Sequence, residues 1–288
     1  MPVNLLAGPA SHKAFAAIIA EALGSEGTYV APTAQIPVDD ASVDQSGGVM
    51  GMGPLAGSRL GNPATVSTEL AVSGSFSGPF TNAGTVVTAA MAIPAGDLTA
   101  YSININMGNG SSVHVAGALF DKYTVKGAVN GRVDYTASFK AQSAVGAADV
   151  TAPTAAPVTP FGTKEVQVTG PLLAVSAASF EISIDNAVKT QMVYNQTVVP
   201  AFVFATNFLI TGKVTMVATG IGDIPTIAAG TKFTLTVVLT NVTSVKTFTI
   251  TNCYATKLAE AVKVGSLTMQ DMDFIGSVNA GAAALTLT

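Results

Sequence analysis

The chain has 288 residues, of which 49% are hydrophobic and only 10% are charged, and its formal net charge at pH 7 is −4. This composition excludes an intrinsically disordered chain, and the acidic balance argues against nucleic-acid binding, which needs a basic surface. Surface charges keep a monomer from associating, and this chain has few of them. The composition therefore favours a protein that buries much of its surface in an assembly. The alternative is a soluble β protein whose polarity comes from Ser, Thr and Asn.

The first predicted element is an amphipathic helix within an N-terminal arm, residues 1–28. Ser11 is a suitable N-cap, and Gly24 would end the helix. The apolar residues on one helical face are Phe15, Ile18, Ile19 and Leu23. A signal peptide is not favoured, because Glu21 interrupts the apolar stretch and no basic segment precedes it. No apolar run reaches the roughly 18 residues of a membrane span. We expect the helix to dock on its own domain or on a neighbour.

From residue 29 onward the sequence predicts β-strands, and much of the pattern occurs twice. Three blocks recur in the same order: residues 36–43 and 182–188, residues 70–76 and 208–214, and residues 113–139 and 248–274. Composition alone does not explain this order, so the sequence predicts a mainly β protein with two tandem β domains. The predicted domains are residues 29–145 and 173–288, and a Pro/Ala/Thr-rich linker joins them at 146–172.

Each predicted domain contains a hairpin and a closing strand. Residues 101–107 alternate between apolar and polar residues, and a Gly-Asn-Gly turn precedes the return strand. Residues 233–239 repeat this pattern in the second copy, where a polar turn also follows. Such alternation is typical of strands with one buried face. The closing strands carry the matched residues Phe139 and Phe274.

A long segment separates the first two strands of each copy, at residues 44–64 and 189–206. Long loops without secondary structure are usually functional. Both segments are too apolar to be simply solvated, and Met-rich sequence suits an adaptable protein contact. The alternative is a loop that folds back over its own core. The residues expected to contact neighbouring proteins are Met50, Met52, Met192, Tyr194 and Phe202.

Groups able to carry catalysis or to bind a metal are sparse. His12 and His114 have no second His, Cys or acidic residue at metal-ligand spacing, and no Gly-x-Ser-x-Gly elbow is present. The Asp pairs at 39–40 and 271–273 lack the Gly-centred loop and distal Glu of an EF-hand. Cys253, the only cysteine, lies in an alternating apolar run and is expected to be a buried structural thiol. We therefore expect no catalytic residue, cofactor or metal.

Three strand motifs in the second copy resemble those of a known family. They are an Ile-x-Ile-Asp-Asn strand from Ile182, an Ile-Thr-Gly-x-Val strand from Ile210, and a closing Asp-Phe at 273–274. In this order they resemble the tail tube (major tail) proteins of long-tailed bacteriophages. As a pattern the resemblance covers most of residues 30–288. The first copy departs from it in the Gly/Met-rich loop.

The resemblance implies a β-sandwich in each domain with a small helix on its side. It also implies that inner strands of neighbouring subunits join into one β-barrel around a channel. Family members with a duplicated domain form trimers, so the resemblance implies stacked, pseudo-hexameric rings that form the tail tube. DNA would pass through this tube into the host without specific binding. Candidate channel-facing acidic residues are Asp39, Asp40, Asp134 and Asp185.

The resemblance further implies a virion protein made in the host cytoplasm, with no membrane partner. Its partners would be further copies of the chain, the tail terminator, the tape measure protein and baseplate or tip proteins. A physical argument that does not depend on the resemblance leads to the same expectation. Unpaired strand edges promote aggregation of a monomer, and they disappear when a ring of subunits closes.

Three other functions stay open at this point. One is another self-assembling β-rich protein, such as a capsid-decoration, surface-layer or pilus-type subunit. A second is a carbohydrate-binding or adhesin module, although a chain with no Trp and six Tyr offers few exposed aromatic platforms. The third is an unrecognised hydrolase.

Overall fold

The computed structural model describes residues 15–51, 65–81, 85–90, 98–106, 111–148, 159–162, 166–170, 177–191, 200–217, 230–241, 244–261, 269–277 and 285–288. The predicted mainly β fold is confirmed, and α1 (Thr85–Ala90) is the one helix among these residues. No helix in the described part of the chain is long and apolar enough to cross a membrane. The strands are β1 (Phe15–Ala20), β2 (Ala34–Ile36), β3 (Asp40–Gly51), β4 (Thr65–Pro79), β5 (Tyr101–Asn106), β6 (Ser111–Ala128), β7 (Asp134–Ala141), β8 (Ser143–Ala148), β9 (Val166–Thr169), β10 (Ala177–Asp185), β11 (Val188–Gln191), β12 (Phe202–Ala205), β13 (Leu209–Val217), β14 (Phe233–Thr240), β15 (Val245–Ala261), β16 (Met269–Gly276) and β17 (Leu285–Leu287).

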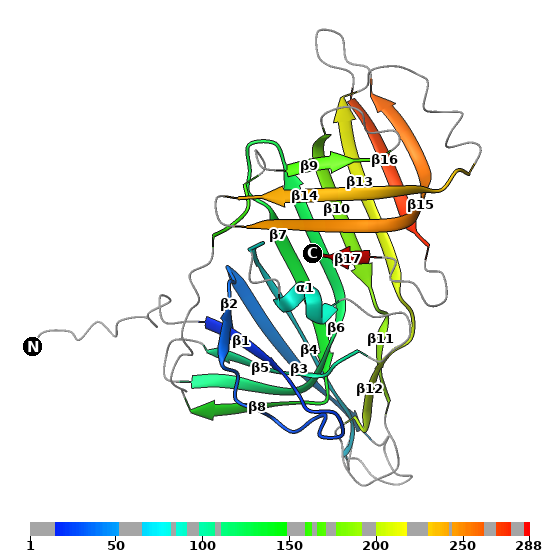
Figure 1. Ribbon diagram of the computed structural model, residues 1–288. Coiled ribbons are helices and arrows are strands. Elements are labelled where there is room, and N and C mark those ends of the chain that lie inside the picture. Colours follow the sequence, from blue (N-terminus) through cyan, green and yellow to red (C-terminus); the bar gives the residue numbers. More distant parts are fainter. Residues whose placement is uncertain are drawn as a thin grey trace, which may run out of the picture.

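Strands from the two sequence copies form one continuous sheet, called the main sheet here (Figure 1). Its order is β3-β4-β7-β6 from the first copy, followed by β10-β13-β16-β15 from the second. The copies meet where residues 122–128 of β6 pair antiparallel with residues 179–185 of β10. The hairpins and closing strands expected from the alternating patterns are confirmed as β5–β6, β14–β15, β7 and β16.

The long strands β6 and β15 each belong to two layers. The first part of β6 leaves the main sheet to pair with β5 and β8, and the first part of β15 pairs with β14 and β17. A single cluster of buried apolar residues spans both copies. Within it Phe80 of the first copy lies 5.5 Å from Phe248 of the second, measured between ring centroids. The range predicted as a linker contains the end of β8 and all of β9, and the division into two domains stays a prediction.

The predicted N-terminal helix is wrong. Residues 15–20 form β1, which pairs antiparallel with β5 on one side and β2 on the other. An apolar run of this length fits a buried strand as well as a helix, and the backbone groups at the edge of β5 need partners. Ala17, which is not among the residues of the predicted apolar helix face, is fully buried. Leu23, which was expected on that face, is 99% exposed. Ser11 lies outside the described residues.

Both copies contain the same backbone irregularities at matched positions. A bulge interrupts the β6–β7 pairing between Phe120 and Lys122, and another interrupts β15–β16 between Ala255 and Lys257. Just before these bulges, Gly117 and Asn252 adopt positive φ angles of 67° and 55°. Matched bulges bend β6 and β15 at the same point, where each strand passes from one layer to the other.

The strand registers correct one part of the sequence alignment. Val43 lies opposite Gly74 and Ile182 lies opposite Gly212. Gly74 and Gly212 in turn lie opposite the matched rings of the two closing strands. The opening strand of the first copy is therefore β3, with Val43 in the place of Ile182. The sequence alignment of Ile36 with Ile182 is wrong, because Ile36 lies in β2.

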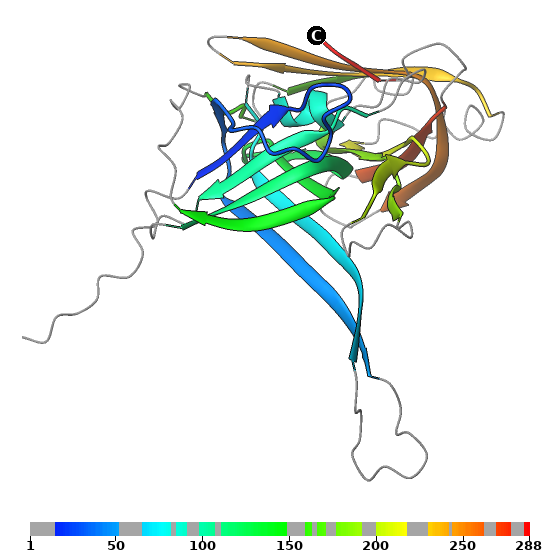
Figure 2. The same ribbon diagram turned by 90° about the horizontal axis from the view of Figure 1, so that it is seen from below.

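The two long segments between opening and second strands also differ from the expectation. Residues 44–51 continue β3 and pair with β4 as an extended hairpin that projects away from the rest of the molecule (Figure 2). In the second copy, β11 and β12 pair as a separate short hairpin. Sequence alternation is weak in both segments, so cross-strand pairing rather than hydrophobic pattern defines these strands.

Candidate assembly interface

The face of the main sheet that points away from the core, called the free face here, is polar. Ser42 and Ser75 form a hydroxyl–hydroxyl hydrogen bond of 2.9 Å across β3 and β4. Thr124 and Ser183 form one of 3.0 Å across the junction of the two copies. Successive side chains of a strand point to opposite faces of the sheet, so these residues lie on the other face from the buried phenylalanines and isoleucines of the same strands. From β3 to β10, the described part of the free face thus presents mainly hydroxyl groups and charges.

The acidic residues singled out from the sequence lie near this face. Asp39 and Asp134 both form ion pairs with the guanidinium of Arg132, and the hydrogen bonds to these carboxylates raise the pKa of Arg132. Asp40 begins β3 and is exposed. Asp185 ends β10, opposite Lys122 of β6. That these carboxylates face a channel stays a prediction.

The main sheet ends in two strand edges. Within the described residues, β3 pairs with β4 alone, and residues 257–261 of β15 pair with β16 alone. Unpaired backbone groups on a long edge are a template for a strand of another chain. These two edges are the outer members of an otherwise continuous sheet, so a second copy of the chain could extend it on either side.

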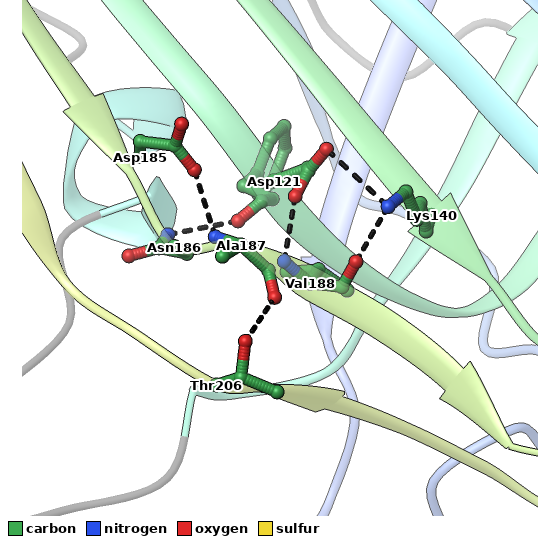
Figure 3. Close-up of polar contacts among 8 residues, drawn as sticks. Asp121, Lys140, Asp185, Asn186, Ala187, Val188 and Thr206 are labelled. Atoms are coloured by element: carbon green, nitrogen blue, oxygen red, sulfur yellow. Dashed lines mark hydrogen bonds and ion pairs between the residues drawn. The ribbon is translucent and has the colours of Figure 1, made fainter.

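The hairpin of β11 and β12 folds back onto the first copy (Figure 3). The side-chain amide of Asn186 donates hydrogen bonds of 2.8 Å to the backbone oxygens of Ala90 and Phe120. The Asp121 carboxylate accepts a 2.6 Å hydrogen bond from the backbone N–H of Val188. These contacts fix the chain at the point where it turns out of β10, so the hairpin is fastened at its base.

Lys140 completes this fastening, which is called the clasp here. Its Nζ donates a 2.5 Å hydrogen bond to the backbone oxygen of Val188 and lies 3.6 Å from the Asp121 carboxylate. Ala187 adopts a positive φ of 45° at the turn, a conformation that costs energy for any residue with a side chain. The described part of this segment is thus fastened to its own chain, and a contact of the segment with neighbouring proteins stays a prediction.

A cleft of about 950 Å³ lies beside the hairpin. Its lining includes three exposed apolar side chains, Leu23, Phe202 and Phe204, which are 99%, 57% and 38% exposed. That Phe202 contacts a neighbouring protein stays a prediction. Met50 lies in β3. The other predicted contact residues, Met52, Met192 and Tyr194, lie outside the described residues.

Sequence reasoning missed the role of Glu21. This carboxylate is buried and accepts hydrogen bonds from the hydroxyl of Ser102 and from the backbone N–H groups of Gly117 and Gly27, at 2.6–2.8 Å. It thereby holds β6 at Gly117 against the segment that follows β1. A lone Glu at the end of an apolar run was the only available signal.

The described residues contain no group of three or more His, Cys, Asp or Glu side chains able to hold a metal ion. His114 stacks on Tyr29 with ring centroids 4.1 Å apart, and burial lowers its pKa. The prediction for Cys253 is confirmed, since the residue is fully buried and burial raises the pKa of its thiol to about 11. His12 lies outside the described residues.

Comparison with known proteins identifies the family of the chain. A family model described as phage tail tube protein matches residues 11–281, nearly the whole chain. A search of the curated proteins gave no match. The family implies a structural component of the virion tail that assembles with itself into a tube. The resemblance seen in the strand motifs is confirmed, and the chain belongs to the phage tail tube protein family.

Proposed function

We propose that three copies of this protein close into a pseudo-hexameric ring, that rings stack into the tail tube, and that the genome passes through the tube into the host. The protein catalyses no reaction in this role. One observation carries the proposal: the two copies within the chain are joined by a strand pairing, β6 with β10, that the two remaining edges can repeat between chains.

The matched registers define the expected pairing between chains. Lys257 follows the bulge of β15 as Lys122 follows the bulge of β6, and Val43 corresponds to Ile182. Within the chain, Ser183 lies opposite Thr124. The corresponding residues are Asp44 of one chain and Ala259 of its neighbour, which should therefore be Cα partners. Residues 42–46 of β3 would pair antiparallel with residues 257–261 of β15.

The size of the sheet supports a ring of three. Each chain contributes eight strands to the main sheet, so three chains give a barrel of 24 strands. At about 4.8 Å per strand the circumference is about 115 Å, and the backbone diameter is about 37 Å before strand tilt widens it. Barrels of 16–18 strands already leave an aqueous channel. A three-chain barrel would have room for a nucleic-acid duplex between its side chains.

Ring stacking would depend on the projecting β3–β4 hairpin (Figure 2). The predicted contacts with the next ring are Met50, which lies in β3, and Met52. The β11–β12 hairpin is held to its own chain by the clasp, so only its exposed surface would be free to contact the next ring. The predicted contact residues of the segment 189–206 are Met192, Tyr194 and Phe202. At the two ends of the tube, the same surfaces would meet the tail terminator and the baseplate or tip proteins, while the tape measure protein would occupy the lumen during assembly. Synthesis in the host cytoplasm precedes this assembly.

Engineered disulfides test the ring. The pair Asp44→Cys and Ala259→Cys should form an interchain bridge in assembled protein, since directly opposed residues meet the Cα separation that a disulfide needs. The pair Thr124→Cys and Ser183→Cys is the matched intrachain control, because those side chains already hydrogen bond at 3.0 Å. Asp44→Cys with Lys257→Cys is the out-of-register control. The native Cys253 is fully buried and should stay silent.

Oxidation of assembled Asp44→Cys/Ala259→Cys protein should end in covalent trimers on a non-reducing denaturing gel. A limiting product of six chains would contradict the three-chain ring. No interchain product, with the intrachain control fully oxidised, would contradict the strand pairing itself. Electron microscopy of the same samples shows whether tubes are present.

A further inference from the structure

One row of side chains crosses the free face and alternates in charge from strand to strand. Every neighbouring pair in it consists of directly opposed residues in two hydrogen-bonded strands. The row, called the charge row here, runs Asp134 (β7), Lys126 (β6), Glu181 (β10), Lys213 (β13), Asp273 (β16) and Lys257 (β15). It crosses the junction between the two copies without a break in the alternation.

Ion pairs reinforce the charge row on both sides. Lys213 Nζ lies 2.7 Å from the Asp271 carboxylate, which also accepts a 2.7 Å hydrogen bond from Thr215. The hydrogen bond from Lys213, followed by that from Thr215, lowers the pKa of Asp271. At the other end Arg132 is paired with Asp134. On the described part of the free face, each cation of the main-sheet strands thus lies beside at least one carboxylate, and Lys122 follows the same rule opposite Asp185.

An unpaired lysine on this face would attract DNA. Each ammonium that neutralises a phosphate releases a counterion, which gives salt-dependent binding regardless of sequence. A face of carboxylates alone would avoid this attraction, but like charges directly opposite each other weaken strand pairing. Alternation meets both requirements, because each lysine of the row lies opposite at least one carboxylate, and Lys126 and Lys213 each lie between two.

We propose that the charge row is a DNA-facing surface that is kept locally neutral, so that duplex DNA moves past it without binding. This inference rests on the proposed function only in placing the free face toward the channel. Glu181 holds the central place, because it lies between Lys126 and Lys213 at the junction of the two copies. Its carboxylate keeps two cations from acting together on one phosphate backbone.

Glu181→Lys is the decisive variant, since it creates three consecutive cations in the row. Binding of a short fluorescent DNA duplex is measured by anisotropy on unassembled protein, in which the free face is open to solvent. The wild type should not bind. Three phosphate contacts predict a log–log salt slope of about −2.7, so affinity of the variant should fall about 40-fold between 50 and 200 mM salt. Glu181→Gln should give weaker binding and a shallower salt slope than Glu181→Lys, because it adds no cation and Lys126 and Lys213 keep Asp134 and Asp273 opposite them.

Glu26→Lys is the matched control, because it makes the same change of net charge at an exposed residue outside the main sheet. Equal duplex binding by Glu26→Lys and Glu181→Lys, or binding by the wild type, overturns the inference. A circular dichroism spectrum like that of the wild type shows that the variants are folded. Because binding is measured before assembly, a failure to form tubes counts against the proposed function and leaves this result intact.

A second readout concerns passage itself. Particles whose tubes carry Glu181→Lys should release their DNA more slowly than particles with Glu26→Lys, and raised salt should restore the rate. Equal release rates at low salt overturn the inference, because a merely structural role of Glu181 would change tube stability without a salt-dependent delay.

Discussion

Replacing Gly74 or Gly212 by alanine tests whether the two copies pack their closing strands in the same way. A Cβ at Gly74 would lie 2.3 Å from Cζ of Phe139 and 2.4 Å from the backbone oxygen of Ser42. A Cβ at Gly212 would lie 2.3 Å from Cζ of Phe274 and 2.3 Å from the backbone oxygen of Glu181. Each glycine is therefore enclosed by a ring on one side and a paired strand on the other.

The cost follows from how little these neighbours can move. Contacts below 3.0 Å force a shift of several tenths of an ångström or more. Phe139 and Phe274 are 1% and 2% exposed, so neither ring has free space to enter. The carbonyl oxygens belong to strands held by their own ladder hydrogen bonds. Overpacking of this kind costs about 1–3 kcal/mol, and two simultaneous clashes place both variants near 3 kcal/mol.

Urea unfolding of unassembled protein measures the effect. Gly146→Ala is the matched control, because no heavy atom lies within 4 Å of the added Cβ, and it should raise the free energy of unfolding by up to about 1 kcal/mol. A loss below about 0.5 kcal/mol in either Gly74→Ala or Gly212→Ala would refute the packing argument. Losses that differ by more than about 1.5 kcal/mol would refute the equivalence of the two sites.

Two further predictions concern single side chains. Asn186→Ala should lower the free energy of unfolding by about 1–3 kcal/mol and speed amide exchange in β11, because the buried oxygens of Ala90 and Phe120 lose their donor; unchanged exchange would contradict the clasp. Burial lowers the pKa of folded His114, so its stabilising contribution is present above the unfolded pKa of about 6.5 and is lost as pH falls through the folded value. His114→Phe keeps the stacking on Tyr29 and should lose less stability than the wild type between pH 7.5 and pH 5; equal losses would contradict this assignment.

Strong periodicity made part of the fold predictable. The hairpins β5–β6 and β14–β15 follow strict alternation, and the closing strands follow the matched residues Phe139 and Phe274. The strand β1 could not be distinguished from a helix, because all of its first four residues are buried and no alternation marks it. Its partner, the edge of β5, lies far away in sequence, so only tertiary pairing decides the conformation.

Register was the second limit on prediction from sequence. The charge row depends on which residues lie opposite each other, and Lys126, Glu181 and Lys213 come from three distant segments. No local pattern brings them together. The opening strand was misplaced for the same reason, since Ile36 resembles Ile182 in sequence whereas Val43 has its position in the sheet.

The two copies differ most where their opening strands end. Asn186 and Ala187 turn the second copy back on itself, and the registers place Gly47 and Gly48 at the matched positions of the first copy. There the chain runs on as β3 with a bulge between Gly47 and Val49. Glycine supplies neither the amide that Asn186 uses nor any side-chain preference for the turn, so the first hairpin lacks the side-chain contact that Asn186 makes in the second.

The receiving side of the clasp has changed as well. The β6 bulge residue Asp121 and its neighbour Lys140 correspond to Thr256 and Ile275 in the second copy. In the proposed ring, Thr256 and Ile275 would lie beside the β3–β4 hairpin of the next chain, and they lack the carboxylate and the ammonium with which Asp121 and Lys140 bind Val188. Both partners of each interchain clasp are thus missing. Each three-chain ring would therefore carry three projecting hairpins and three clasped ones, an alternation that identical single-domain subunits could not encode.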